Sequence, residues 1–364
     1  MHLKEILIKN FRNYQEEKVT FHRKVNIITG KNAQGKTNLL EAIYIMSLGK
    51  SFRTNKDSEM IGFGKSYSKV NSLFEKDDQD LEMEIIYGKE GKSIKIDGVK
   101  AKKNIELLEN VYIVVFSPDD LKIVKDEPEK RRRFIDRELC QIKPTYYRNL
   151  ARYKKILTQR NALLKQENFK ENHLLVWNEE LAEYGSRIML ERREFVEKLS
   201  KISSTISNSI TNQKEEMIVT YDSNIESKDN LKDQKQVFFH RLEETRDNDL
   251  FRRSTTVGPH KDDLKIWLQD LDIRNFGSQG QQRTAALSLK LAEIQLIKDE
   301  TSINPILLLD DVLSELDEER QRFLIHSLKD VQLFITTTEI SEALMNSLPD
   351  RYIFTVQKGR VQLI

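Results

Sequence analysis

The chain has 364 residues, of which 38% are hydrophobic and 32% are charged, so it is long enough to build a core in each of two lobes. Its 60 Lys and Arg residues nearly balance its 58 Asp and Glu residues, and a nucleic-acid surface would have to come from local patches of positive charge. A single cysteine, Cys140, excludes an internal disulfide, and no apolar run reaches the roughly 20 residues that cross a bilayer, which indicates a reduced, cytoplasmic setting without a membrane partner.

The first predicted elements are two strands. Residues 3–11 form one of them, and the apolar, β-branched run at residues 25–29 predicts a second, buried strand. Arg12 follows the first strand and therefore lies one strand ahead of the glycine-rich segment described next. Arg12 either contacts a nucleotide phosphate or is a surface arginine.

Residues 30–37 have the spacing G-x-x-x-x-G-K-T of a phosphate-binding loop and lead into an apolar helical pattern. Two glycines let the backbone curl so that successive N–H groups point into one concavity, to which a helix N-terminus adds positive charge. We expect Lys36 to reach the β- and γ-phosphates of ATP and Thr37 to ligate Mg²⁺. The residues predicted to bind ATP are Gly30, Lys31, Asn32, Ala33, Gln34, Gly35, Lys36, Thr37 and Asn38.

The rest of the first lobe is predicted to be a mixed α/β structure. Residues 81–87 and 93–97 alternate with a period near two, which predicts antiparallel strands at an edge of the lobe. The denser apolar run at residues 111–116 predicts a buried strand. Arg53 lies in a polar loop between these elements, where it either faces nucleotide or DNA or is a solvated arginine.

The composition changes after about residue 125, and strand-like runs are nearly missing before Met217. Apolar residues recur at helical spacing over residues 144–165 and 173–210, which predicts two long antiparallel helices joined by a polar turn near residues 168–172. We therefore expect an inserted, mainly α-helical lobe at residues 126–251 and a head built from residues 1–125 and 252–364.

Basic side chains on this lobe are candidates for a surface that contacts the DNA backbone. An ordinary solvated helix face explains each of them at least as well. Phosphate contacts would give an affinity that falls steeply with salt and shows little base-sequence preference. The candidates are Arg131, Arg132, Arg133, Arg148, Arg152, Lys154 and Lys155. His260, further along, is either a hydrogen-bonded loop histidine or a contact to DNA or nucleotide.

A second anion-binding pattern precedes a helix predicted from about residue 282 to 299. Ser278 stands where an N-cap belongs, and Gly280 keeps the backbone open to close approach, although a plain helix cap explains this pattern too. The phosphate loop already serves the nucleotide of its own subunit. We therefore expect Ser278, Gly280 and Gln281 to cap the ATP of a second subunit in an ATP-dependent homodimer.

The buried strand predicted at residues 306–310 ends in an acidic pair. Carboxylates at the C-terminal end of a parallel strand hold Mg²⁺ and orient the attacking water in nucleotide hydrolases. We expect Asp310 to take the metal and Asp311 to polarise the water, with Lys36 and the hydroxyl of Thr337, at the end of the next strand, as the other catalytic residues. Residues 351–356 and 360–364 predict a terminal hairpin.

These motifs, in this order, resemble the ATP-binding-cassette fold, and most closely its chromosome-maintenance branch, which includes the SMC heads. More narrowly, residues 10–14, 51–54, 117–121, 131–136 and 257–264 are similar to blocks of the bacterial RecF family. The resemblance implies an ATP-dependent clamp on single-stranded and gapped DNA that acts at the nucleoid in replication and repair. It further implies that RecO and RecR are partners in loading RecA and in supporting the SOS response.

Two positions depart from the wider cassette pattern. Asp311 stands where Glu is usual, and Thr337 or Thr338 stands where His is usual. Both changes weaken water activation while leaving ATP binding intact. We expect a weak, DNA-stimulated ATPase that acts as a switch, with turnovers on the order of one per minute, far below the ~10 per second median of enzymes. A structural scaffold with a degenerate site and a soluble cassette motor domain remain the alternatives.

Overall fold

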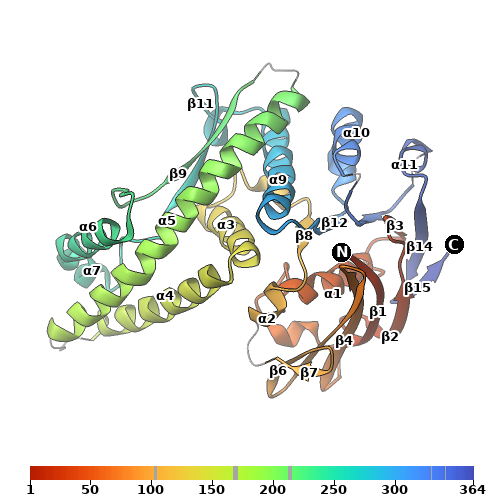
Figure 1. Cartoon of the computed structure of the whole chain (residues 1–364), viewed down its shortest axis with the longest axis horizontal. Coiled ribbons are helices and arrows are strands. Elements are labelled where there is room, and N and C mark those ends of the chain that lie inside the picture. Colours follow the sequence, from red (N-terminus) through yellow and green to blue (C-terminus); the bar gives the residue numbers. More distant parts are fainter. Residues whose placement is uncertain (102–104, 167–170, 212–214, 329, 341) are drawn as a thin grey trace. The chain divides into compact units, whose positions relative to one another are not determined.

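The computed structural model describes residues 1–101, 105–166, 171–211, 215–328, 330–340 and 342–364 (Figure 1). It consists of two compact units, one formed by Met1–Leu121 with Glu293–Ile364 and the other by Lys122–Ala292. Within the described residues, no helix combines the length and the apolar composition needed to cross a membrane.

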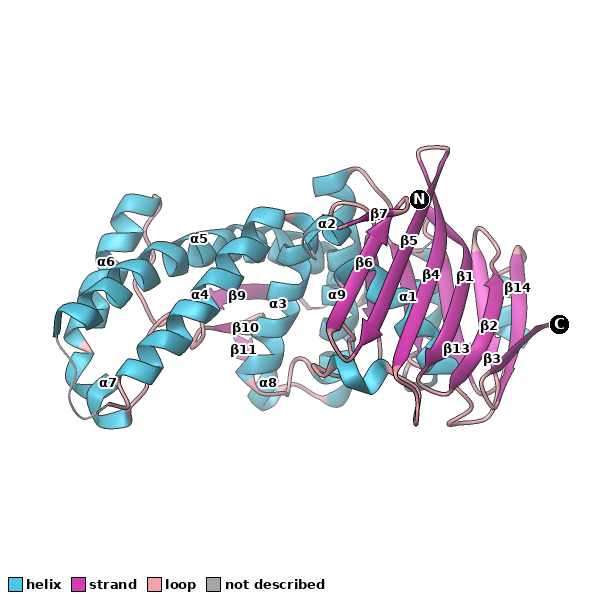
Figure 2. Ribbon diagram, turned by 90° about the horizontal axis from the view of Figure 1, so that it is seen from below, coloured by secondary structure: helices cyan, strands magenta, loops and turns pink. Residues whose placement is uncertain are grey.

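An antiparallel sheet in the first unit is built from β1 (His2–Phe11), β2 (Tyr14–Thr20), β4 (Tyr67–Lys76), β5 (Gln79–Gly88), β6 (Gly91–Ile96) and β7 (Val99–Lys100). The strand order is β2-β1-β4-β5-β6-β7 (Figure 2). Alternate side chains enter the core, as Val70 and Phe74 do in β4. The antiparallel pairing of β5 and β6 confirms the prediction for that part of the chain. The strands β2 and β4 were not predicted.

A second sheet of the first unit is built from β3 (Val25–Thr29), β8 (Ile113–Phe116), β12 (Ile306–Asp310), β13 (Leu333–Thr337), β14 (Arg351–Gln357) and β15 (Arg360–Leu363). The strand order is β15-β14-β3-β13-β12-β8, and all pairs are parallel except β14 with β15. The central strands are apolar on both faces, as expected for a covered parallel sheet. Together the two sheets confirm the predicted α/β fold with an antiparallel part.

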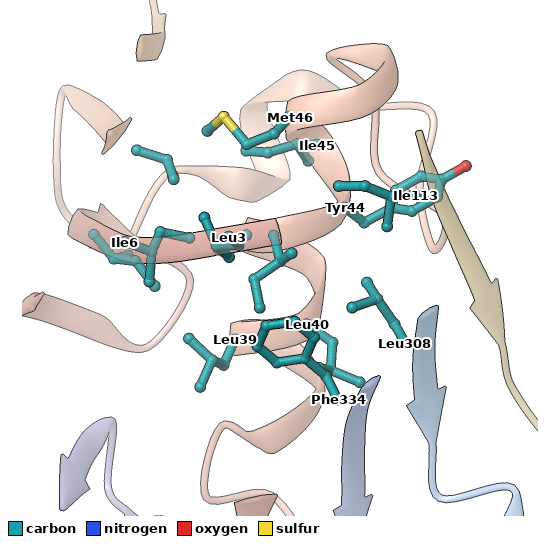
Figure 3. Close-up of a cluster of buried hydrophobic side chains, with 14 of the residues drawn as sticks. Leu3, Ile6, Leu39, Leu40, Tyr44, Ile45, Met46, Ile113, Leu308 and Phe334 are labelled. Carbon is teal, nitrogen blue, oxygen red and sulfur yellow. The ribbon is translucent and has the colours of Figure 1, made fainter. Parts of the chain in front are cut away.

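The helix α1 (Lys36–Leu48) follows β3 and is buried nearly all round. Figure 3 shows why: its side chains meet Leu3 and Ile6 of β1 together with Leu308 and Phe334 of the parallel sheet. A helix covered by both sheets needs no polar face, which explains its continuous apolar sequence. The start of α1 is therefore held rigidly at the carboxyl ends of the parallel strands.

Shorter helices complete the first unit. They are η1 (Asp57–Met60), α2 (Ile105–Leu108), η3 (Leu313–Glu315), α10 (Glu318–His326) and α11 (Glu342–Ser347). The short helix η2 (Asp120–Lys122) and the long helix α9 (Gln279–Thr301) each cross the division between the two units. The predicted helix at residues 282–299 is thus present and begins three residues earlier than expected.

The second unit is mainly helical. Its helices are α3 (Pro128–Ile142), α4 (Pro144–Leu163), α5 (Glu171–Ile210), α6 (Leu231–Glu244), α7 (Arg246–Arg252) and α8 (Ile273–Phe276). The predicted pair of long helices is α4 and α5, which pack side by side (Figure 1). Of the turn predicted between them at residues 168–172, residues 168–170 lie outside the described residues. The unit also contains a small antiparallel sheet of β9 (Met217–Asp222), β10 (Asp263–Leu268) and β11 (Leu271–Asp272).

The second boundary between the units lies further along the chain than the sequence pattern indicates. Residues 252–292 were expected in the head, but the compact division groups them with the inserted unit. The reason is strand pairing: β10 runs antiparallel to β9, from Asp263 opposite Asp222 to Leu268 opposite Met217. A pairing between segments about 40 residues apart leaves no mark in a local pattern.

Candidate nucleotide-binding site

The phosphate loop connects β3 to α1 in the predicted order of strand, turn and helix. Gly30 begins the loop with φ of 147°, and a Cβ at this position would lie 2.5 Å from the carbonyl oxygen of Val356. Only glycine fits there without moving the neighbouring strand. Among the described residues, the backbone amides from Lys31 to Asn38 donate to no acceptor. Open amides at a helix N-terminus are a ready anion site.

Lys36 folds back over the loop. Its Nζ donates to the carbonyl oxygens of Gly30 at 2.6 Å and Lys31 at 3.3 Å, and the residue is only 7% exposed. Burial lowers the pKa of Lys36, and the charges of Asp311 and Asp310 act against this shift. The ammonium group is thus held in the loop by two neutral acceptors. A phosphate could replace these acceptors with a gain in charge pairing.

Thr37 and Asp310, predicted as the Mg²⁺ pair, meet in the structure. Thr37 Oγ1 donates to Asp310 Oδ1 at 2.9 Å, and Thr336 Oγ1 donates to the same oxygen at 2.9 Å. Burial raises the pKa of Asp310, while the hydrogen bonds from Thr37 and Thr336 act in the opposite direction. A hydroxyl and a carboxylate are hard oxygen donors of the kind that hold Mg²⁺ beside nucleotide phosphates.

Thr336 is a site residue that sequence reasoning missed. The strand β13 ends in Thr336 and Thr337, and the parallel register places Thr336 opposite Asp310 of β12. The hydroxyl of Thr337, the predicted catalytic residue, instead donates to the carbonyl oxygen of Glu339 at 2.6 Å. The run of hydroxyls was visible in the sequence, but its register against the acidic strand was not.

Asp311, the predicted water-polarising residue, directly follows β12 in a left-handed conformation with φ of 56°. Its backbone N–H donates to Thr336 Oγ1 at 2.9 Å. A non-glycine residue held in this region stores strain of the kind found at functional sites. This conformation turns the chain directly after Asp310, so Asp310 and Asp311 stand on different parts of the turn.

Arg12 is half-buried, and its guanidinium is paired with a buried carboxylate. Its Nε and Nη2 donate to the carboxylate of Glu41 at 2.8 and 2.7 Å, and Glu41 is fully buried one helical turn after Thr37. Arg53 Nη1 lies 3.4 Å from the same carboxylate and donates to Asn38 Oδ1 at 2.7 Å. A single buried glutamate therefore holds two cations beside the loop. The signal that could have found Glu41 is an acidic residue inside an otherwise apolar helical run.

The second predicted anion site lies in the other unit and forms a reciprocal helix cap. The amide of Ser278 donates to Gln281 Oε1 at 2.8 Å, and the amide of Gln281 donates to Ser278 Oγ at 3.2 Å. Gln281 Nε2 also donates to Glu215 Oε1 at 2.7 Å. Ser278 is exposed and Gly280 is half-buried. This is the capping-box arrangement, which stabilises the start of α9.

The basic candidates for DNA contact differ sharply in exposure, and one of them is a correction. Arg131 is 1% exposed and donates through Nε and Nη2 to both carboxylate oxygens of Asp263, at 2.7 and 2.8 Å. The prediction of a DNA contact for Arg131 is therefore wrong, because its guanidinium is enclosed and paired. Arg132 is half-buried and donates to the carbonyl oxygen of Asp262 at 2.7 Å.

The other candidates are exposed. Arg133 pairs with Glu129 at 2.7 Å, Arg152 with Glu180 at 3.0 Å, and Lys154 lies 3.8 Å from Asp136. Arg148 and Lys155 are exposed on α4 and, among the described residues, have no ion pair. The helix α4 contains basic residues but no Asp or Glu.

His260 is a hydrogen-bonded loop histidine, one of the two alternatives left open by the sequence. Its Nδ1 lies 2.7 Å from the hydroxyl of Tyr153 and its Nε2 lies 3.1 Å from the carbonyl oxygen of Thr255. The carbonyl accepts only, so Nε2 carries the proton and Nδ1 accepts from Tyr153. Burial lowers the pKa of His260 to about 4, which keeps the ring neutral at pH 7.

Comparison with known proteins gives consistent results. A family model described as the RecF/RecN/SMC N terminal domain matches residues 2–361. The chain is 45% identical over 363 residues to the DNA replication and repair protein RecF of Clostridioides difficile strain 630, with 99% of this chain and 98% of that one covered. It is 45% identical over 365 residues to the protein of the same name from Alkaliphilus oremlandii, with 99% of this chain and 100% of that one covered.

Comparison with solved structures gives the same result as comparison of sequences. The structure of the recombination mediator protein RecF-ATPrS in the RecFOR pathway matches with a TM-score of 0.93 at 39% identity, covering 100% of this chain and 98% of that one. An SMC head bound to the C-winged helix domain of ScpA matches with a TM-score of 0.57 at 17% identity, covering 100% of this chain and 97% of that one. The second match shows a shared fold.

Proposed function

The chain belongs to the RecF family of DNA replication and repair proteins, and from this premise we propose that it is an ATP-dependent DNA-binding protein of recombinational repair. In this proposal it acts in the RecFOR pathway, with RecO and RecR as partners in loading RecA at gaps and in supporting SOS induction. The observation that carries the ATP dependence is the contact of Thr37 with Asp310 beside a loop of open amides. A relative solved as RecF-ATP, 39% identical over the whole chain, supports the same ligand.

In the proposed ATP complex, the amides of the phosphate loop receive the phosphate oxygens, and Lys36 exchanges its two carbonyl acceptors for them. Thr37 and Asp310 would hold Mg²⁺, which neutralises charge on the phosphates when bound. Asp311 would orient water, and Thr337 would contribute a hydroxyl near the γ-phosphate. Since neither a glutamate nor a histidine serves these two roles, hydrolysis is slow and acts as a timed switch.

The proposed active form is a homodimer in which Ser278, Gly280 and Gln281 of one subunit cap the ATP of the other. The exposure of Ser278 supports this role, because its hydroxyl and the helix N-terminus behind it can meet an anion from outside. The first unit would serve as the ATPase head and the helical insertion as the arm. The protein would work in the cytoplasm, at the nucleoid.

The proposed DNA surface lies on α4. Arg148, Arg152 and Lys155 stand at positions i, i+4 and i+7 and are exposed, so they form one basic stripe along the helix. No acidic residue lies in this helix. Arg152 pairs with Glu180 of α5, but Arg148 and Lys155 have no ion pair among the described residues, so the stripe keeps a net positive charge despite the near balance of charge over the whole chain. Such a surface fits phosphates of single-stranded or gapped DNA.

The test is ATP-dependent DNA binding on gapped, duplex and single-stranded DNA, with the oligomeric state measured in parallel by gel filtration. We expect wild-type protein to dimerise with ATP and Mg²⁺ and then to bind DNA. Lys36→Ala should impair both steps by weakening ATP binding, whereas Ser278→Arg should bind ATP but stay monomeric. If both variants dimerise with ATP as the wild type does, the shared-site model is wrong. If the wild type binds DNA equally well with and without ATP, the result favours a passive structural scaffold.

A further inference from the structure

The outer side of the phosphate loop is held by segments from both ends of the chain. The carbonyl oxygen of Gln34 accepts from the amide of Gly359 at 3.0 Å and from Asn13 Nδ2 at 2.9 Å. The side-chain oxygen of Gln34 accepts from the amide of Lys358 at 2.8 Å. Lys358 and Gly359 form the turn between β14 and β15, so the C-terminal hairpin donates two backbone hydrogen bonds to one residue of the loop.

The neighbouring residues of the loop are held in the same way. Asn13 Oδ1 accepts from Asn38 Nδ2 at 2.8 Å, which ties the turn after β1 to the first turn of α1. The buried hydroxyl of Tyr14 donates to the carbonyl oxygen of Gly35 at 2.9 Å. The two consecutive carbonyls of the loop, at Gln34 and Gly35, are therefore both fixed from outside.

Fixing these carbonyls also fixes the loop amides. A peptide unit is planar, so the C=O of one residue and the N–H of the next point in opposite directions. The bonds to Gln34 O thus set the direction of the Gly35 N–H, and the bond to Gly35 O sets that of the Lys36 N–H. These two amides belong to the open set that faces the proposed phosphate site.

We propose that the turn Lys358–Gly359 and Asn13 are positioning residues of the ATP site, which hold the loop amides in the direction that the phosphates need. This inference rests on the proposed ATP binding and goes beyond it. None of these residues touches ATP in the proposal. They lower the cost of ordering the loop when ATP binds, which is the effect of preorganisation on affinity.

The hairpin is itself anchored and tightly fitted. Arg360 Nη1 donates to Glu17 Oε1 at 2.8 Å and the amide of Val361 donates to Glu17 Oε2 at 3.2 Å, which ties β15 to β2. At Gly359 φ is +71°, and a Cβ would lie 2.5 Å from the carbonyl oxygen of Asn13. A side chain at this position must therefore push the turn away from Asn13 and from Gln34.

Gly98 offers a matched control within the same unit. It lies in the turn between β6 and β7 with φ of +76°, and a Cβ there would meet nothing within 4 Å. Gly359→Ala and Gly98→Ala therefore impose the same left-handed backbone strain on two hairpin turns of one fold. Only the first substitution displaces a turn that contacts the phosphate loop.

The experiment measures the Kd for ATP with Mg²⁺ and the thermal midpoint without nucleotide for the wild type and both variants. We expect Gly359→Ala to raise the Kd about tenfold and Gly98→Ala to leave it within about twofold. The loss in thermal midpoint should be larger for Gly359→Ala, because its Cβ also meets the carbonyl oxygen of Asn13. ATP turnover at saturation should stay within about twofold for both, since no group on the phosphates has changed, so the effect of Gly359→Ala appears in KM.

A Kd for Gly359→Ala equal to that of Gly98→Ala would overturn the inference. Should Gly359→Ala fail to fold, Asn13→Ala decides the matter, because it removes a donor to Gln34 without straining the turn. A wild-type Kd for Asn13→Ala would then reject the inference, and a raised Kd with an unchanged saturated rate would support it. Absence of ATP binding by the wild type would instead refute the proposed function, and the inference with it.

Discussion

Two loops of this protein carry equally conspicuous sequence motifs, yet their polar groups are used in opposite ways. In the phosphate loop, the amides from Lys31 to Asn38 find no acceptor among the described residues. In the loop at residues 257–264, the polar groups bond to neighbouring segments of the chain. Asn224, for example, bonds to both the amide and the carbonyl of Gly258, at 2.9 and 3.0 Å, and also to Asp262.

The second loop is the centre of a closed network. Arg192 donates to the carbonyl oxygen of Pro259 at 2.6 Å and to Asp136 at 2.7 Å, and Asp262 accepts from Tyr221. Burial raises the pKa of Asp262. A motif that is fully satisfied within the protein stabilises a fold, whereas a motif with open donors awaits a ligand. The degree of hydrogen-bond satisfaction thus separates structural motifs from binding motifs, although their sequences look alike.

We expect the largest loss of stability from a substitution of Arg160, which belongs to the hydrogen-bond network around the second loop. This residue pairs with Asp249 at 2.7 Å, both side chains are fully buried, and Arg160 also donates to Thr255, two residues before the second loop. Arg160→Leu leaves Asp249 charged and buried, so we expect a loss of about 3–5 kcal/mol in unfolding free energy. Urea denaturation measures this loss. The control Arg187→Leu, at an exposed pair with Glu183, should cost under about 0.5 kcal/mol.

A substitution in the phosphate loop should weaken ligand binding without lowering the stability of the protein. Lys36 bonds only to loop carbonyls, so Lys36→Ala should weaken ATP binding on the order of 50-fold while the thermal midpoint without ATP stays near that of the wild type. Titration with ATP and Mg²⁺ measures the affinity. The exposed Lys89→Ala serves as the control. A large loss of stability in Lys36→Ala would mean that the phosphate loop, like the loop at residues 257–264, mainly stabilises the fold.

The closed network should also respond to acid. The pKa of His260 is lowered from 6.5 to about 4 in the folded protein. Between these two pH values, the unfolded chain binds a proton at His260 and the folded chain does not. This contribution to stability is therefore complete above about pH 6.5 and is lost as the pH falls toward 4, by about 3 kcal/mol in all. The difference between wild type and His260→Gln in urea midpoints across this range isolates it. A pH-independent difference would contradict the neutral, buried histidine.

The smallest effects are expected at the exposed basic stripe. Arg148→Ala and Lys155→Ala should each reduce DNA affinity a few-fold, by about 1 kcal/mol or less, and lower the salt slope by about one unit, with no change in stability. Affinity measured at several salt concentrations tests this. Arg131→Leu serves as the comparison. Because Arg131 is buried and paired with Asp263, we expect its substitution to lower the stability of the fold. An unchanged salt slope in both stripe variants would remove α4 from the DNA surface.

Local spacing in the sequence was enough for several features. The glycine turn between strand and helix, the acidic end of β12, the two long helices and the terminal hairpin all appear where periodicity and turn residues indicate. These features are set by neighbours within a few residues. In contrast, β4 was missed because Ser68 and Ser72 alternate with Val70 and Phe74 on the buried face, which hides its apolar alternation.

Other features depend on contacts between distant segments, and only the tertiary structure decides them. Thr336 meets Asp310 through strand register, Arg131 is enclosed by Asp263 across 132 residues, and the Gly359 amide reaches Gln34 from the far end of the chain. A residue type states which bonds a side chain can make, but burial and pairing determine which ones remain for a ligand. For this chain, the sequence by itself identified the phosphate loop and its acidic partner, while the folded structure decided which charged groups stay available.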